Sequence, residues 1–214
     1  MIKVWGRATS SNVQAAMWCV GELGLAHERI DVGGAFGGLD TPDFIAMNPH
    51  QRIPVVQDGP ATLWESNAII RYLASRYGRD DFWPEDPVQR AQIDMWMEWV
   101  KTTLYPVFVG GVFWTLVRTP KAERNMAQHE ANLATVDSLM KLAEAQLSAS
   151  KGLFFVADTF TPADISFGHL LYRYFTLEIE RPDLPRLREY YDSLTGRDAY
   201  RTHVMISYDS LRVE

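Results

Sequence analysis

The chain has 214 residues, of which 47% are hydrophobic and 22% charged, ordinary proportions for a globular protein that can bury a sizeable core. Its net charge of −6, with no block of Lys or Arg, argues against nucleic-acid binding. The single cysteine, Cys19, excludes an intramolecular disulfide framework and fits a reducing compartment. The start of the sequence has no basic segment ahead of an apolar one. No apolar run approaches the ~20 residues that span a membrane, so we expect a cytoplasmic protein.

The first 32 residues predict a strand, a helix and a second strand. Residues 2–5 have a short strand pattern. Apolar residues then recur at spacings of three and four over residues 13–25, which predicts an amphipathic helix. Ser10, Ser11 and Asn12 precede it, and any of the three could cap it. Residues 28–32 predict the second strand.

The next 46 or so residues complete a small α/β unit. Residues 33–38 form a Gly-rich loop that does not match the dinucleotide pattern GxGxxG; we interpret it as a flexible connection, with a lid over a ligand as the alternative. A short helix starts near Pro42. Residues 53–57 and 61–64 predict a hairpin, with a proline at the second position of its first strand, and a helix follows from residue 66. The order is therefore βαβ, a short helix, ββ and α.

A change of pattern near residue 78 predicts a domain boundary. Residues 79–87 are rich in turn formers and charge, and everything beyond them has helical periodicity. Pro106 and the Gly110-Gly111 pair should kink the first long helix. The predicted helices cover 88–117, 120–148, 162–175 and 183–195.

Four stretches, in this order and spacing, resemble the glutathione transferases, specifically the bacterial members that use serine or asparagine rather than tyrosine. They are Ala-Thr-Ser-Ser-Asn-Val-Gln at 8–14, Asn-Pro-His-Gln-Arg-Ile-Pro at 48–54, Trp-Glu-Ser-Asn-Ala-Ile-Ile-Arg-Tyr-Leu at 64–73 and Thr-Pro-Ala-Asp-Ile-Ser at 161–166. The resemblance implies a thioredoxin-like glutathione-binding domain (1–78), a linker (79–87) and an all-helical domain (88–214) that completes an electrophile pocket. It also implies glutathione as co-substrate, a small electrophile as partner and a homodimer.

The start of the first helix suits activation of a thiol. A free thiol has a pKa of about 8.5, and lowering it by two units takes about 2.7 kcal/mol of preferential thiolate stabilisation. A hydroxyl aimed at the sulfur, with the positive end of a helix, can supply it. The resemblance places Ser10 at the family's catalytic serine and Asn12 at an assisting asparagine. Ser11 or Asn12 as the main donor, or a purely capping role, are the alternatives.

Six further residues are expected to bind glutathione. By resemblance, Ile53-Pro54 is a cis-proline turn whose neighbouring backbone pairs with the cysteinyl part of the tripeptide; an ordinary edge-strand proline is the alternative. Ser66, at a helix start, suits the γ-glutamyl carboxylate, and Glu65 suits its ammonium. Arg52, with Gln51, would reach the glycyl carboxylate, although Arg52 could also be a solvated surface charge.

Aromatic side chains should line the electrophile pocket. The candidates are Tyr105, Phe108, Phe113 and Trp114, with Phe36 from the Gly-rich loop, and each could equally be a core residue. Arg7 and Arg118 could meet an acidic electrophile. We interpret Cys19 as a buried structural thiol and the Thr161-Pro162-Ala163-Asp164 capping box as structural. The five histidines have no metal-ligand spacing, so we expect no metal.

The leading function is transfer of glutathione to a small electrophile. Glutathione-dependent disulfide reduction or peroxide removal is an alternative that Asn12 keeps open, and dehalogenation of small halo-acids is another. The absence of a Cys-x-x-Cys motif excludes a dithiol mechanism. A non-catalytic glutathione-binding protein is the third possibility.

Overall fold

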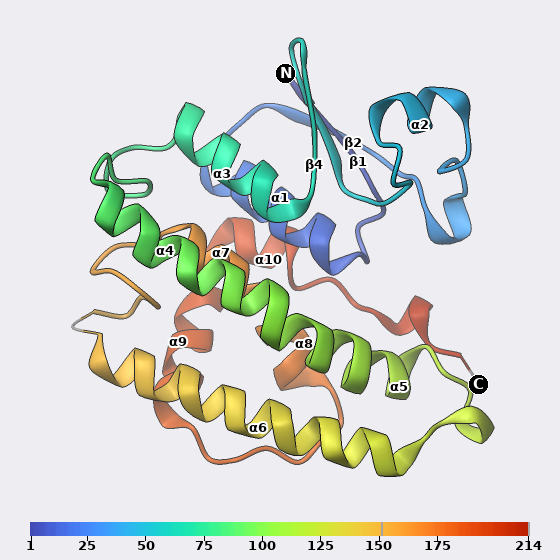
Figure 1. Ribbon diagram of the computed structural model, residues 1–214, viewed down its shortest axis with the longest axis vertical. Helices are drawn as coiled ribbons and strands as arrows, with labels where there is room; N and C mark the ends of the chain where they lie inside the picture. The colour runs from blue at the N-terminus through green and yellow to red at the C-terminus, as the bar shows by residue number, and fades with distance from the viewer. Residues whose placement is uncertain (151, 214) are drawn as a thin grey trace.

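The computed structural model describes residues 1–150 and 152–213, and it begins with a four-stranded mixed sheet (Figure 1). The strands are β1 (Ile2–Trp5), β2 (His27–Ile30), β3 (Val55–Asp58) and β4 (Ala61–Trp64). Their order is β2-β1-β3-β4, with β2 parallel to β1 and both β3 and β4 antiparallel to their neighbours. The predicted α/β order is confirmed.

Two strand boundaries differ from the predicted ones. β2 begins at His27 rather than residue 28 and ends at Ile30, because it pairs residue for residue with the four-residue β1. β3 begins at Val55 rather than residue 53, because Pro54 has no N–H to donate to the sheet and follows Ile53 through a cis peptide bond. The predicted cis-proline turn is therefore present.

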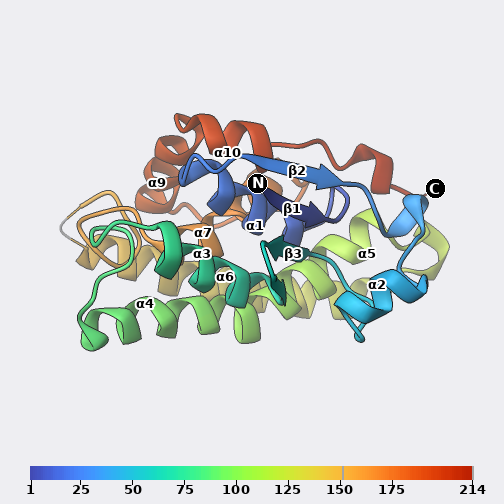
Figure 2. The same cartoon turned by 90° about the horizontal axis from the view of Figure 1, so that it is seen from above.

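Three helices accompany the sheet: α1 (Ser11–Glu22), α2 (Pro42–Met47) and α3 (Ser66–Tyr77). α1 starts two residues before the predicted helix, directly after Ser10 at the N-cap position. It is buried over most of its length because it packs against α3 and against α7 (Pro162–Gly168) and α10 (Asp198–His203) of the helical part; Figure 2 shows it between α3 and α10.

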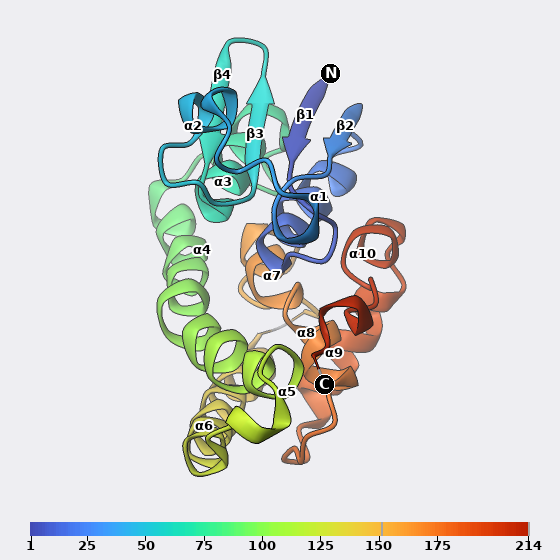
Figure 3. The same cartoon turned by 90° about the vertical axis from the view of Figure 1, so that its right-hand side faces the viewer.

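A single long helix, Pro87–Val117, leads into the helical part and curves along its length (Figure 3); it is called the long rod below. It begins as α4 (Pro87–Trp99), continues through π-helical turns over Val100–Leu104 and Pro106–Phe113, and ends as α5 (Trp114–Val117). Pro106 and the two glycines thus lie in wide turns, which tolerate a missing N–H.

By length and composition this helix could cross a membrane, although it contains no continuous apolar run of the length considered in the sequence. In the fold its apolar residues Phe108, Val109 and Val112 are fully or almost fully buried, and its second half packs against α6 (Met126–Ala149). Its apolar character therefore serves the core of the helical part.

The remaining helices are α8 (Leu171–Thr176), α9 (Pro185–Thr195) and α10. The prediction of a single helix over 162–175 was wrong, because this segment divides into α7 and α8. At the break, the Gly168 carbonyl accepts a hydrogen bond from the Tyr200 hydroxyl instead of from a backbone N–H of the helix. α10 was not predicted. The predicted capping box is confirmed, since the Asp164 carboxylate accepts from the backbone N–H of Thr161 at 2.8 Å.

Two of the contacts that join the sheet part to the helical part involve α1. Glu22 of α1 forms a bidentate ion pair with Arg197, both contacts at 2.7 Å, and Trp18 of α1 packs edge-on against Tyr200. Cys19 is fully buried nearby, and burial raises the pKa of its thiol, which agrees with a structural role. The division at 79–87 stays a prediction; the predicted helical domain, 88–214, includes Lys151 and Glu214, which lie outside the described residues.

Candidate active site

A cavity of about 530 Å³ lies where the start of α1, the loop before β3, the start of α3 and the long rod meet. It gathers all nine residues predicted for thiol activation and glutathione binding: Ser10, Ser11, Asn12, Gln51, Arg52, Ile53, Pro54, Glu65 and Ser66. These come from three separate stretches of the chain, so the fold brings together what the sequence could only place in order.

The three candidate thiol-activating residues differ in what their side chains already contact. The Ser11 hydroxyl is 2.9 Å from the Tyr105 hydroxyl, and Ser11 is buried. The Asn12 side-chain oxygen accepts from the Lys101 ammonium at 2.7 Å and from the Ser66 hydroxyl at 3.4 Å. Ser10 is half-buried at the cavity wall, and within the described residues its hydroxyl has no hydrogen-bond partner. Of the three, Ser10 is the one whose side chain makes no hydrogen bond within the described residues, whereas Ser11 is bonded through its hydroxyl and Asn12 through its amide oxygen, with the Asn12 amide nitrogen still without a partner there.

Lys101 is a site residue that sequence analysis missed. Its ammonium lies 3.2 Å from the Ser66 hydroxyl and 4.8 Å from the centre of the Tyr105 ring, in addition to its contact with Asn12. Burial lowers the pKa of this ammonium, an effect that the carboxylates of Glu65 and Glu98 partly offset. A lysine among the apolar positions Met97, Leu104 and Phe108 of one helix was the available signal.

The loop before β3 is held in place by Asn48. The buried Asn48 side chain donates to the carbonyl of Arg52 at 2.8 Å and accepts from the N–H of His50 at 2.9 Å. This fixes the backbone that carries Gln51, Arg52 and the cis Ile53–Pro54 bond. Arg52 itself is exposed at the rim of the cavity, where an anionic group could meet it.

The start of α3 presents polar groups to the cavity. Glu65 precedes the helix with a backbone φ of 69°, a left-handed conformation that a glutamate rarely adopts. Such strain persists where the surrounding structure holds it, often at functional sites. Ser66 is buried at the first helical position, so its hydroxyl and the N–H groups of the helix start face the same space.

Three of the five aromatic candidates line the cavity: Tyr105, Phe113 and Trp114. Phe108 does not, because it is fully buried and packs edge-on against Tyr174 in the helical core. Phe36 does not either, because its loop turns it outward and leaves its side chain 59% exposed.

Three arginines also line this cavity: Arg7, Arg118 and Arg173. Arg173 was not predicted; it lies in α8, almost fully buried, and donates to the carbonyl of Thr9 at 2.7 Å. Arg7 donates to the Thr9 hydroxyl at 3.1 Å. Burial, with the charge of the neighbouring arginines, lowers the pKa of Arg7 and that of Arg173, the latter to about 10. Across residues 1–150 and 152–213, none of the three forms an ion pair.

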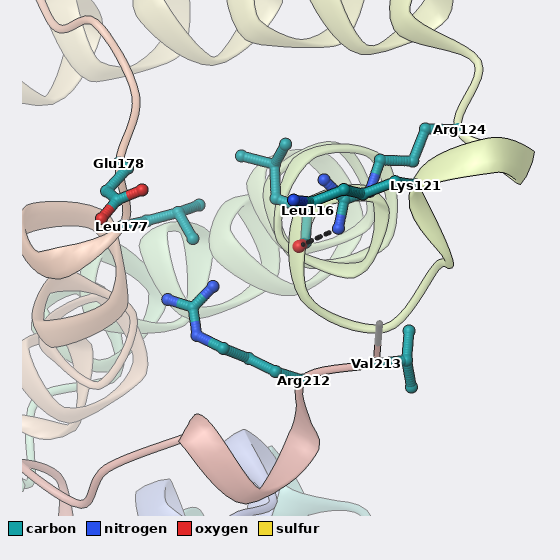
Figure 4. A pocket seen from close by; sticks show the side chains of 7 residues that line it. All are labelled: Leu116, Lys121, Arg124, Leu177, Glu178, Arg212 and Val213. Carbon is teal, nitrogen blue, oxygen red and sulfur yellow. Dashed lines mark hydrogen bonds between the residues drawn. The ribbon is translucent and has the colours of Figure 1, made fainter.

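A second cavity, of about 810 Å³, lies on the other side of the C-terminal segment 211–213 from the first cavity (Figure 4). None of the residues predicted for the active site lines it. Its Arg124 donates to the carbonyls of Leu116 and Thr119 and so satisfies the end of the long rod, a structural role. Leu211 lines the first cavity, whereas Arg212 and Val213 line the second, so this segment separates the two. No cluster of three metal-ligating side chains occurs in the part of the chain that is described.

Comparison with known proteins identifies the family. Residues 1–75 match the family model described as "Glutathione S-transferase, N-terminal domain". The chain is 38% identical over 208 residues to glutathione S-transferase GstB of Escherichia coli K12, covering 96% of this chain and 99% of that protein. The chain belongs to the glutathione S-transferase family.

Solved structures agree with this assignment. The theta-class glutathione S-transferase from Xanthomonas axonopodis pv. citri, with glutathione bound, superimposes with a TM-score of 0.91 at 44% identity, over 96% of this chain and 98% of that one. A Bombyx mori glutathione transferase has a TM-score of 0.86 at 23% identity, over 98% of this chain and 95% of the other, and supports the fold alone. The fold of the family is thus a thioredoxin-like sheet part followed by helices, as the resemblance implied.

Proposed function

We propose that this member of the family transfers glutathione to a small electrophile, with Ser10 as the group that stabilises the thiolate. The observation that carries the proposal is the uncommitted Ser10 hydroxyl beside the first turn of α1, in a cavity that also holds every expected glutathione contact. The hydroxyl and the N–H groups of the helix start favour the ionised sulfur. The thiolate attacks the electrophilic carbon, a carbon–sulfur bond forms and the leaving group departs.

The proposed position of glutathione follows from the charges around the cavity. Its γ-glutamyl end lies at the start of α3, with its carboxylate on Ser66 and its ammonium on Glu65. Its cysteinyl backbone pairs with the chain at Ile53, as an added strand would. Its glycyl carboxylate meets Arg52, with Gln51 beside it. Lys101 adds a positive charge near the γ-glutamyl carboxylate, while Tyr105, Phe113 and Trp114 border the electrophile.

Competing roles of the neighbouring residues are less well supported. The Ser11 hydroxyl is already hydrogen-bonded to Tyr105, and the contacts of the Asn12 oxygen with Lys101 and Ser66 hold its side chain towards the start of α3, although its amide nitrogen has no partner within the described residues. Disulfide reduction through a protein thiol is disfavoured because the single cysteine is fully buried in α1.

Kinetics of Ser10→Ala test the proposal, with Ser11→Ala as the matched control. Removing one donor to the reacting sulfur should lower kcat/KM for 1-chloro-2,4-dinitrobenzene by about 100-fold, and Ser11→Ala should lower it by less than about tenfold. Equal turnover by Ser10→Ala and the unmodified protein would contradict the assignment. Faster turnover of a glutathione mixed disulfide than of the aryl halide would favour the reductase alternative, and no turnover of either would favour a non-catalytic binder.

The resemblance also supports a cytoplasmic homodimer with a role in detoxification. The mass in solution, measured by light scattering, tests the dimer: about twice the 24.4 kDa of one chain is expected.

A further inference from the structure

The cavity has a strongly cationic end that the proposed position of glutathione does not use. Arg7, Arg118 and Arg173 line it together with Tyr105 and Trp114, and burial together with the charge of the neighbouring arginines lowers the pKa of both Arg7 and Arg173, so the three lie close together. The proposed glutathione contacts engage Arg52, Glu65, Ser66 and Lys101 instead. Both carboxylates of the tripeptide therefore have proposed binding partners other than these three arginines.

Two of the guanidinium groups converge on one residue. Arg7 and Arg173 hold the hydroxyl and the carbonyl of Thr9, the residue before Ser10, so their charges lie within one residue of the proposed thiolate donor. The Nε and Nη1 atoms of Arg173 have no hydrogen-bond partner in residues 1–150 and 152–213. Arg118 reaches the same cavity from the end of the long rod, with its guanidinium 5.4 Å from the centre of the Trp114 ring.

Like charges gathered in a partly buried space repel one another and lose hydration, which disfavours the empty site. Planar guanidinium groups match the geometry of a carboxylate, and one bound oxyanion would relieve the repulsion. Gly34 favours this arrangement, since a Cβ on it would lie 2.8 Å from Arg7 Nε and displace that side chain.

We propose that the electrophile taken by this enzyme carries a small oxyanion, a carboxylate in the simplest case, which Arg7, Arg118 and Arg173 bind while the reactive carbon faces Ser10. The inference rests on the proposed function. The aromatic rings of Tyr105 and Trp114 border the space between, which suits a flat substrate. The step is substitution: the thiolate forms the carbon–sulfur bond, and the leaving group departs with the bonding electrons while the oxyanion stays unchanged.

A matched pair of aryl halides tests this selectivity. 4-Chloro-3-nitrobenzoate and 4-chloro-3-nitrobenzamide differ mainly in charge at the end away from the chlorine, and both release chloride on attack by glutathione. For each, kcat/KM is divided by the uncatalysed rate constant to remove intrinsic reactivity. We expect this normalised value to be at least about tenfold higher for the benzoate than for the benzamide.

Arg118→Gln is the informative variant, because Arg118 is exposed and its replacement should not prevent folding. The benzoate-to-benzamide ratio should fall by about tenfold or more, and inhibition by 3-nitrobenzoate should weaken in parallel. Arg79→Gln, on the surface with its side chain 85% exposed, is the matched control and should leave the ratio unchanged. Arg7→Gln provides an independent second variant.

Three outcomes would be decisive. A ratio near one in the unmodified protein overturns the inference, provided the benzamide is turned over and the thiolate signal of bound glutathione is present. A benzoate-to-benzamide ratio that is unchanged in both Arg118→Gln and Arg7→Gln also overturns the inference. So does a shift in the pKa of the bound glutathione thiol without a change in that ratio, because the arginines would then act on the sulfur and not on the electrophile. Absence of both thiolate and turnover would instead contradict the proposed function.

Discussion

Replacing Lys101 by methionine should separate glutathione binding from stability. The ammonium of Lys101 contacts Asn12 and Ser66 at the end of the cavity assigned to the γ-glutamyl carboxylate. At about 4–6 Å and an effective dielectric constant of about 20, one such charge attracts a carboxylate by about 3–4 kcal/mol. Water replaces part of this in the variant, so we expect a loss of about 1.5–3 kcal/mol, which raises the KM for glutathione about 10- to 150-fold.

The same substitution should not destabilise the glutathione-free protein. Burial lowers the pKa of Lys101, so its protonated form is disfavoured in the folded state relative to the unfolded chain at neutral pH. Methionine keeps the aliphatic length and removes that penalty, and Ser66 can still donate to Asn12. We expect a melting temperature equal to or above that of the unmodified protein.

The assay measures initial rates against glutathione concentration at saturating electrophile, together with thermal unfolding without ligand. Lys121→Met, an exposed lysine on the wall of the other cavity, is the matched control and should change neither quantity. A KM for glutathione within about twofold of the unmodified value would refute the electrostatic argument. A clearly lower melting temperature would show that Lys101 is mainly structural.

Three further predictions concern stability and reactivity. The pKa of the buried His169 is lowered to about 3, so the unfolded chain takes up its proton first as the pH falls below about 6.5, and stability should decline towards pH 3. By pH 5 the free energy of unfolding should have fallen by about 2 kcal/mol through His169 alone. Denaturant unfolding at pH 7.5 and pH 5 measures this fall, which His169→Gln should lack. An equal fall in the variant and the unmodified protein would contradict the assignment. Glu22→Gln should lower the free energy of unfolding by about 1–3 kcal/mol because it breaks the bidentate pair with Arg197. Asp198→Asn, at a carboxylate whose side chain is 95% exposed, is the control and should have almost no effect. Equal losses of unfolding free energy in the two variants would contradict the argument from burial. Cys19 should react with a disulfide reagent only after denaturation, and rapid labelling of the native protein would contradict its burial.

The sequence predicted the sheet part well because its signals are local. Strand patterns, the hairpin turn at Asp58-Gly59 and the serine that begins α3 each depend on neighbouring residues, and the structure has these elements within two residues of the predicted bounds. The division of 162–175 into α7 and α8 could not be predicted, because it depends on Tyr200, 32 positions away in the sequence from Gly168.

Among the residues that line the cavity, those in a motif were predicted and those placed there only by packing were missed. Ser10, Arg52, Ile53, Glu65 and Ser66 lie in motifs, and all line one cavity. Lys101 and Arg173 lie in helices without a motif, and their part in the site depends on how α4–α5 and α8 cross the start of α1. Phe108 and Phe36 show the opposite error: an aromatic residue at a suitable place in the sequence can face the core or the solvent.

The central claim is that Ser10 stabilises the thiolate of bound glutathione. The most direct test is an ultraviolet difference titration, from pH 5 to 9, of the protein saturated with glutathione, for the unmodified chain and for Ser10→Ala. We predict a thiolate signal already present near neutral pH, about two pH units below that of free glutathione, and a shift back towards about 8.5 in the variant. An identical titration in both proteins, with glutathione bound in each, would contradict the claim and transfer the role to Ser11 or Asn12.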